Sequence, residues 1–318
     1  MRVGVFWLGL AAVFIGGLLF TAWAENPFLF FAGYAILQSL IMAIAWNILG
    51  GFTGYVNFGS AGFFAVGAYT AIALHKLMDP PLLVMLLASG VVCALIGLAT
   101  GYLTLRLRGV YFAIATLAMA IVFESLVTNW EFVGGSAGAY VITPAKVPFF
   151  DTYAEMLFVL MLVLSLVSVA ISRYLSTSRM GQGLAAIRDD ETAAECMGVP
   201  TLRLKLISTT VMGAMMGVCG APFPFFVTYI NPLSAFDLLI AVNAIAMPMI
   251  GGTAVWFGPV IGALLLGTIQ QLITVTISSE LNILIVGAVL IAFVALAPRG
   301  IVGLFQDFAR KRRERRGP

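Results

Sequence analysis

The sequence predicts an all-α, polytopic membrane protein of about ten transmembrane helices. Only 10% of its 318 residues are charged and 61% are hydrophobic, whereas a soluble globular chain carries about 25% charged residues. Apolar runs of about 20 residues, the length that spans a bilayer, recur along the whole sequence. Because no polar stretch is long enough for a second soluble domain, residues 1–318 are expected to form a single transmembrane domain.

The first apolar run, at about 5–23, is open to two interpretations. It follows Arg2 and ends in Ala22-Trp23-Ala24, which resembles the cleavage site of a signal peptide. The run is longer than the usual 7–15 residues of a signal core, which favours a first helix that is retained. The later spans are expected at about 28–49, 58–74, 82–105, 110–127, 154–172, 206–227 (interrupted by Pro222 and Pro224), 236–250, 259–277 and 282–297.

Basic residues predict the orientation of these spans. Arg106 and Arg108, the polar loop 173–205 and the tail 299–318 all fall on one side of the ten-helix arrangement, and six of the 17 basic residues lie in the last nine positions. Lys and Arg concentrate in cytoplasmic loops, so both termini are expected in the cytoplasm. The tail is expected to lie beside anionic lipid of the bilayer rather than to bind nucleic acid.

Several kinds of chemistry are disfavoured by the sequence. None of the four lysines follows a glycine, so there is no phosphate-binding P-loop. One histidine and three scattered cysteines give no metal-ligand spacing and no disulfide framework. The acidic residues Glu124, Asp237 and Glu280 fall near the outer ends of the expected spans, which disfavours proton coupling. We therefore expect no catalytic residues, no metal and no cofactor.

Two glycine-rich segments are expected to interrupt the helices at membrane depth. Residues 50–54 precede Phe58-Gly59, and residues 251–253 precede Phe257-Gly258. Non-helical backbone inside a membrane must line a cavity or be buried in protein. A cavity is favoured at the first segment, and a cavity and a close-packed turn are equally open at the second. The candidate residues of a translocation path are Asn47, Thr53, Gly54, Asn57, Ser60 and Thr116. Further polar residues in the spans are Gln38, Thr70, Asn243 and Thr253. The alternative role for each of these residues is a hydrogen bond between packed helices.

The inner loop contains one or two predicted short helices over 183–199. Acidic side chains favour the first turn of a helix, so Asp189, Asp190 and Glu191 are expected to open the second one, and Gly198 suits its C-terminal cap. Leu184, Ile187, Ala194 and Met197 are expected to supply an apolar face. Such a helix suits docking to a cytoplasmic partner, and a helix lying on the membrane surface is the alternative. The candidate docking residues are Ala186, Arg188, Asp189, Asp190, Glu191, Ala194 and Gly198.

Three segments together resemble a known family over about residues 37–298. They are NILGGFTGYVNFGSAGFFAVGAY at 47–69, LRGVYFAIATL at 107–117 (followed by Asn129-Trp130 and Gly134-Gly135), and AIRDDETAA at 186–194 (ending Met197-Gly198-Val199). The sequence is similar to the permease subunits, M type, of bacterial branched-chain amino acid ABC importers. Ser60 stands where the family commonly has His, which leaves other amino acids, urea and amides open as solutes.

The resemblance implies a set of partners and a location. It implies a heterodimer with a second permease subunit, two cytoplasmic ABC ATPases, a periplasmic substrate-binding protein and a place in the bacterial inner membrane. The third segment then corresponds to the loop that docks into the ATPase, whose closure would alternate access to the path. The alternative function is a self-sufficient carrier or facilitator for a small neutral solute, and a urea- or amide-type ABC permease is a nearer variant. A membrane-embedded enzyme is disfavoured, because no His, Cys or paired-carboxylate cluster lies in the spans.

Overall fold

The described part of the protein is a bundle of helices with one small strand pair. A computed structural model describes residues 3–24, 26–142, 150, 152–276, 284, 287–288, 291 and 300–304. Its longer helices are α1 (Val3–Trp23), α2 (Pro27–Thr53), α3 (Ser60–Met78), α4 (Leu82–Thr104), α5 (Val110–Thr128), α6 (Tyr153–Thr177), α7 (Arg179–Asp189), α9 (Thr201–Gly220), α12 (Leu238–Gly251) and α13 (Gly258–Thr276). The shorter elements are η1 (Glu131–Val133), η2 (Gly135–Ala137), β1 (Ala139–Tyr140), α8 (Glu191–Cys196), α10 (Phe223–Val227), β2 (Tyr229–Ile230) and α11 (Pro232–Ala235).

The described part of the chain holds eight helical segments long and apolar enough to cross a membrane. They confirm the all-α, polytopic fold. The span expected at about 259–277 corresponds to α13, whose apolar part is slightly shorter. The span expected at about 282–297 lies outside the described residues.

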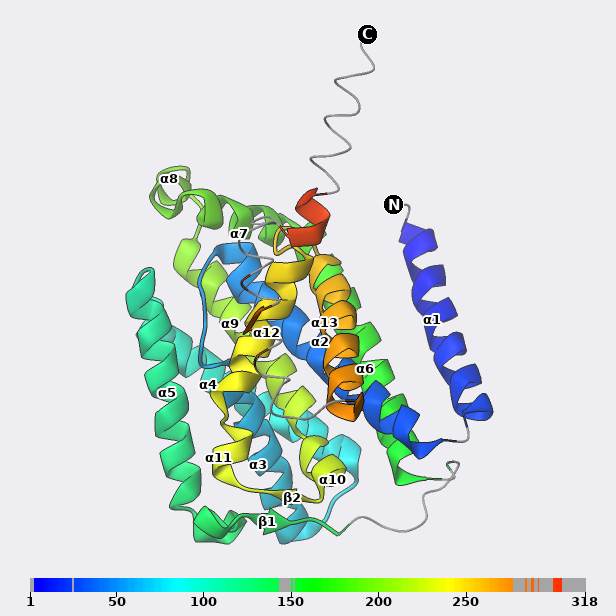
Figure 1. Cartoon of the computed structure of the whole chain (residues 1–318). Helices are drawn as coiled ribbons and strands as arrows, with labels where there is room; N and C mark the ends of the chain where they lie inside the picture. Colours follow the sequence, from blue (N-terminus) through cyan, green and yellow to red (C-terminus); the bar gives the residue numbers. More distant parts are fainter. Residues whose placement is uncertain are drawn as a thin grey trace.

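The two ends of the bundle differ in character. Figure 1 shows α7, α8 and the start of α1 at one end, and the strands β1 and β2 with α10 at the other. The strands pair antiparallel, with Ala139 opposite Ile230 and Tyr140 opposite Tyr229. This pairing ties the segment after α5 to the segment after α9, and it closes the end of the bundle remote from α7 and α8.

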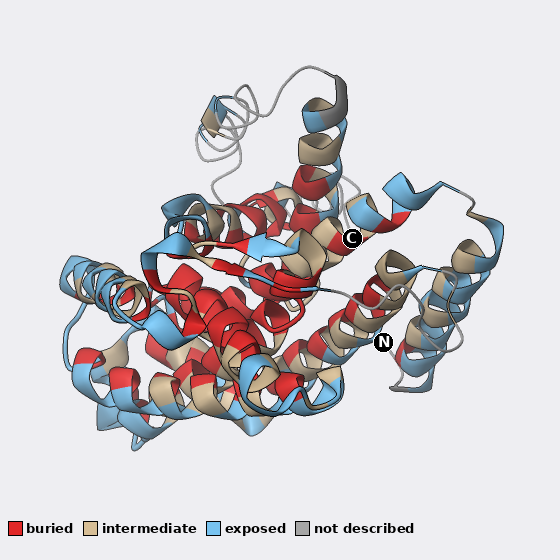
Figure 2. Cartoon of the chain, turned by 90° about the horizontal axis from the view of Figure 1, so that it is seen from below, coloured by how far each residue is buried: buried red, intermediate tan, exposed pale blue. Residues whose placement is uncertain are grey.

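Helix α9 lies in the core, and glycines let its neighbours approach closely. In the most apolar 18-residue stretch of residues 201–227, 61% of the residues are buried, whereas in that of α1 only 6% are buried. Figure 2 shows this contrast between the buried centre and the exposed outer helices. A Cβ atom added at Gly217 would lie 2.5 Å from Cβ of Cys93 in α4, and one at Gly213 would lie 2.7 Å from the Cys93 carbonyl oxygen. Small residues at such crossings are typical of membrane helix packing.

Helix α1 is peripheral and is anchored near one end by an aromatic cluster. The guanidinium carbon of Arg173 lies 3.9 Å from the ring centroid of Phe6 and 5.5 Å from that of Trp256. Phe6 is consequently buried, although most of α1 is exposed. This packing fits a helix that stays with the bundle, and its retention in the mature protein stays a prediction.

The first backbone break lies further along the chain than the sequence predicts. Helix α2 continues through Gly50 and Gly51 to Thr53, so the expectation of a helix end at about 49 is wrong. A Cβ atom at Gly51 would lie 2.8 Å from the carbonyl oxygen of Thr253, and the glycine therefore serves close packing inside the helix. The non-helical segment is 54–59, and it begins with Gly54 in the left-handed conformation (φ 79°).

The inner loop is shorter than expected. Helix α6 extends to Thr177 and α9 begins at Thr201, so both helices extend into the expected loop 173–205. The stretch between them, 178–200, holds α7 and α8. The interruption expected at Pro222 and Pro224 is confirmed, because α9 ends at Gly220 and α10 follows it.

Candidate functional site

The broken segment 54–59 obtains its hydrogen bonds from side chains of neighbouring helices. Trp46 in α2 donates its indole N–H to the Asn57 carbonyl oxygen (2.8 Å), and the Phe58 N–H donates to Oγ1 of Thr116 in α5 (3.2 Å). The side-chain oxygen of Asn57 accepts from the Gly59 N–H (2.7 Å). Since extended backbone in a bilayer needs such partners, α2 and α5 are what allow the helix to stop here.

A groove of about 700 Å³ opens beside this segment, which confirms the cavity expected at the first break. One wall is the broken segment, another is the start of α5, and the third is the junction of α7 and α8. The lining residues are Thr53, Gly54, Tyr55, Val56, Phe58, Arg108, Gly109, Val110, Ala113, Ile187, Arg188, Asp190, Glu191 and Thr192. The second break is a close-packed turn and not a cavity. A Cβ atom added at Gly251 would overlap the backbone of Gly258, and one added at Gly258 would overlap the backbone of Gly252.

The helices α7 and α8 meet at an elbow set by Asp190. Its backbone is extended (φ −159°, ψ 109°), and its side chain caps α8 by accepting from the Ala193 N–H (3.0 Å). Gly198 follows α8 in the left-handed conformation (φ 83°). The predictions that Asp190 and Glu191 open this helix and that Gly198 follows its end are therefore confirmed. Asp189 is the last residue of α7, so the expectation that it also opens the second helix is wrong. Leu184, Ile187 and Ala194 are buried as expected, but Met197 is 85% exposed and the expectation that it joins their face is wrong; the other three side chains pack on the bundle, whereas Met197 projects from the turn after α8.

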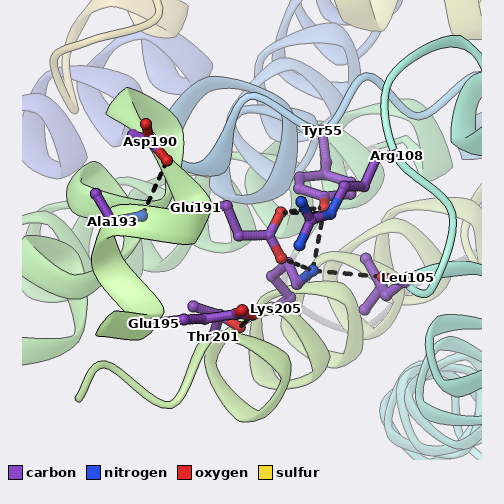
Figure 3. A network of polar contacts seen from close by, with 9 residues as sticks. All are labelled: Tyr55, Leu105, Arg108, Asp190, Glu191, Ala193, Glu195, Thr201 and Lys205. Carbon is purple, nitrogen blue, oxygen red and sulfur yellow. Dashed lines mark hydrogen bonds and ion pairs between the residues drawn. The ribbon is translucent and has the colours of Figure 1, made fainter. Parts of the chain in front are cut away.

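A polar network joins this elbow to the broken segment (Figure 3). Lys205 in α9 donates to Glu191 Oε1 (2.6 Å), to the Tyr55 hydroxyl (3.1 Å) and to the Leu105 carbonyl oxygen (3.3 Å). The Tyr55 hydroxyl donates to Glu191 Oε2 (2.5 Å), and Arg108 lies 3.8 Å from the same oxygen. The side chain of Lys205 is only 4% exposed and that of Glu191 13%. Three segments of the chain, which carry Tyr55, Arg108 and Lys205, therefore converge on the carboxylate of Glu191.

The network keeps Glu191 ionised and Tyr55 protonated. Partial burial by itself raises the pKa of Glu191, but hydrogen bonds from Lys205 and Tyr55 and the charges of Lys205 and Arg108 outweigh burial, and the pKa is lowered. Burial, with the adjoining carboxylate of Glu191, raises the pKa of Tyr55. The phenol thus remains a donor and the carboxylate an acceptor at neutral pH.

A second contact from the elbow reaches the end of α2. Arg188 donates from Nη1 to the Gly51 carbonyl oxygen (3.5 Å), and its Nε lies 3.6 Å from Oδ1 of Asp189. A Cβ atom at Gly54 would lie 3.4 Å from Cγ of Arg188. A cation at the carbonyl end of a helix is stabilised by the helix dipole, so Arg188 holds α7 against the last turn of α2.

Comparison with known proteins identifies the family. A model of the branched-chain amino acid transport system permease component matches residues 28–294. The chain belongs to this family. The permease is 26% identical over 288 residues to the high-affinity branched-chain amino acid transport system permease protein LivM of Escherichia coli (strain K12), covering 83% of the chain and 67% of the relative. It is 27% identical over 292 residues to the probable branched-chain amino acid transport permease protein LivH of Methanocaldococcus jannaschii, covering 86% and 91%. No solved structure matches the permease. It is therefore a multi-pass membrane component of a transport system.

The path residues expected from the sequence occupy three different environments in the permease. Thr53 and Gly54 line the groove. Asn57 and Thr116 line a narrow space of about 10 Å³ between α3, α4, α5 and α9, enough for about one water. Asn47 and Ser60 are fully buried inside the subunit. Their role in a translocation path stays a prediction.

The polar contacts of the two most buried members of this set also differ. Asn47 donates to the Thr253 carbonyl oxygen (3.2 Å), which connects the end of α2 to the second break. The Ser60 hydroxyl has no hydrogen-bond partner among the described residues. Asn47 thus has a structural contact inside the subunit, and Ser60 does not.

Sequence reasoning placed Glu191 in the inner loop but missed the other members of its network. Tyr55 lies in the segment 47–69 and Lys205 at the end of the loop expected at 173–205, and neither residue has an expected role there. The sequence contains one indication of this pairing. Lys205 directly precedes the apolar run expected at 206–227, and an unpaired ammonium beside such a run is costly, so an acidic partner nearby is to be expected. Glu191 and Asp190 are the nearest acidic residues that begin a helix.

Proposed function

We propose that this permease is the membrane-spanning, non-catalytic subunit of an ATP-driven ABC importer for branched-chain or related amino acids. It forms half of the translocation path together with a second, similar permease subunit. Two cytoplasmic ABC ATPases hydrolyse ATP, and a periplasmic binding protein delivers the solute. Support for the solute comes from LivM and LivH, whose names state branched-chain amino acid transport, and support for separate ATPases comes from the absence of a P-loop in the full sequence.

The observation that carries the coupling role is the position of the α7–α8 elbow. It contacts the non-helical segment through the network of Glu191 and the end of α2 through Arg188. A displacement of α7 and α8 is therefore transmitted to the end of α2 and to the non-helical segment 54–59 that follows it. The proposed ATPase-docking set is Ala186, Arg188, Asp189, Asp190, Glu191, Ala194 and Gly198.

The topology follows from the same geometry. The end of the bundle with α7 and α8 carries Arg108, Arg179 and Arg188, and we place it in the cytoplasm of a bacterial cell, with both termini on that side. The basic segment 299–318 then lies beside the inner leaflet of the inner membrane. The groove, with Thr53 and Gly54 in its wall, opens at the cytoplasmic end, and we assign Asn47, Asn57, Ser60 and Thr116 to the adjoining part of the path.

The test is purification of the tagged chain from its native membrane in mild detergent, followed by mass spectrometry and by uptake in proteoliposomes. We expect a second permease subunit and two ATPases to copurify, and uptake of labelled leucine to require ATP and the binding protein. Uptake by the isolated chain without ATPases would overturn the proposal in favour of a self-sufficient carrier.

A further inference from the structure

A second, smaller cavity lies away from the groove, between α2 and α12. Its volume is about 80 Å³, which is room for about five to eight water molecules. Gln38 and Ser39 on α2 and Asn243 on α12 provide its polar side chains. The remaining lining is apolar and consists of Met42, Ile240, Ala244 and Met247.

This cavity lies deep in the spans. Gln38 is 11 residues from the start of α2 and 15 from its end, which corresponds to about 17 and 22 Å along the helix. Gln270, which contacts the cavity wall from α13, is 12 residues from the start of that helix, or about 18 Å. Figure 1 shows α12 and α13 running alongside α2 through the body of the bundle.

The amide groups around the cavity are only partly satisfied. Gln270 donates from Nε2 to Oδ1 of Asn243 (3.1 Å). The side-chain oxygen of Gln38 is buried and has no hydrogen-bond partner in the part of the chain that the structure describes. A buried amide without a partner costs free energy in a protein and more in a bilayer, and polar groups inside spans commonly mark a solute pathway.

We infer that this cavity is a binding station for the polar head of the solute on its way across the membrane. The inference rests on the proposed function. The Gln38 carbonyl accepts a hydrogen bond from the ammonium or amide N–H of the solute, and Asn243, whose oxygen is held by Gln270, donates from Nδ2 to its carboxylate or carbonyl. Met42 and Met247 contact the aliphatic part. Unbranched methionine side chains adapt to side chains of different shape.

The side chains that line the cavity suit weak, reversible binding of a solute that moves across the membrane. Among the described residues, no charged side chain lines the cavity, and the groups that these residues offer a zwitterion there are neutral. A pathway site must bind well enough for the solute to enter and weakly enough for it to leave. An acidic or basic residue at this depth would bind the oppositely charged end of a zwitterion tightly, and it would favour the binding of ions over that of zwitterions.

The experiment uses the whole importer, with both permeases, the ATPases and the binding protein, in proteoliposomes. ATP-dependent uptake of labelled leucine, with urea as a second probe, is measured for the unmodified complex and for Gln38→Leu. We expect Gln38→Leu to lower the maximal uptake rate at least tenfold, the usual effect of losing one hydrogen bond to a charged group, while basal ATP hydrolysis and assembly remain within twofold. Gln38→Asn should recover part of the uptake. The matched control is Gln271→Leu, the same substitution on α13 at a residue that does not line the cavity, and it should leave uptake unchanged.

The outcomes separate the two proposals. If the unmodified complex imports leucine and Gln38→Leu imports it equally well, the binding station is refuted and the proposed function stands. If Gln38→Leu reduces uptake, basal ATP hydrolysis and assembly together, Gln38 is a packing residue and the station is again refuted. If the unmodified complex shows no ATP-dependent uptake of either probe, both proposals fail.

Discussion

Replacing Glu191 with glutamine tests whether the network between the inner loop and the broken segment holds the two together. The substitution removes the charge but keeps an acceptor for Lys205, which is 3% exposed. Within the part of the chain that the structure describes, the other acceptors of Lys205 are the Tyr55 hydroxyl and the Leu105 carbonyl oxygen. Removing one partner of a fully buried ion pair costs about 3–5 kcal/mol. Because Glu191 is 13% exposed and glutamine still accepts, we expect about 2–3 kcal/mol. The exposed Arg108 adds less than about 1 kcal/mol.

The assay is thermal unfolding of the purified chain in detergent, followed by tryptophan fluorescence. For a chain of this size, the expected loss corresponds to roughly 3–5 °C in the apparent Tm. The matched control is Glu195→Gln in the same helix, whose carboxylate accepts from the Thr201 hydroxyl (2.7 Å) and forms no ion pair among the described residues. Adding Lys205→Met to Glu191→Gln should recover at least half of the loss, since a buried pair is often replaceable by apolar residues. A Tm for Glu191→Gln equal to that of the control would refute the reasoning.

Three further predictions concern the same region. Gly54→Leu should still insert into the membrane but abolish uptake, because its φ of 79° is strained for leucine and its side chain would fill the groove beside Arg188; normal uptake would mean that the break is only a turn. Replacing Arg188 and Asp189 with alanine should leave ATP hydrolysis by the assembled complex intact while uptake falls, and unchanged uptake would contradict the coupling role. Since the pKa of Glu191 is lowered on folding, its stabilising contribution should be complete above the ordinary carboxyl pKa of about 4.3 and be lost as pH falls through the lower folded value. The Tm difference between the native chain and Glu191→Gln should therefore be constant from pH 8 to 5 and shrink below about pH 4; a change centred near pH 6–7 would contradict this assignment.

The parts of the fold that depend on local pattern were predictable from the sequence. Span length follows from apolar run length, so the positions of α4 and α5 differ from expectation by a residue or so. The ends of α8 follow from Asp190 and Gly198, because capping depends on residues next to each other in the chain. The family resemblance, confirmed by the match over 28–294, depended on the same local segments.

The parts that depend on distant contacts were not predictable in this way. The sequence predicts a break at Gly50 and Gly51, but both residues are helical, and Gly51 lets the carbonyl oxygen of Thr253 approach the helix closely. In sequence, a glycine that ends a helix and a glycine that admits a neighbouring backbone look alike. In the Glu191 network, Glu191 is 136 positions from Tyr55 and 14 positions from Lys205. No periodicity in the sequence indicates that these residues are paired.

The contact between Asn47 and Thr253 has a consequence for the biogenesis of the protein. These residues are 206 positions apart, so ribosomal synthesis must proceed through α12 before the end of α2 can close against the second turn. Until then Gly51 leaves an unfilled notch in a helix that is already inserted, and the Asn47 amide lacks its acceptor. Nascent chains halted before residue 253 should therefore be recognised by membrane quality-control proteases, whereas chains extended past α13 should be resistant. Degradation rates that do not change at this length would show that the notch is filled by lipid or by another protein during synthesis.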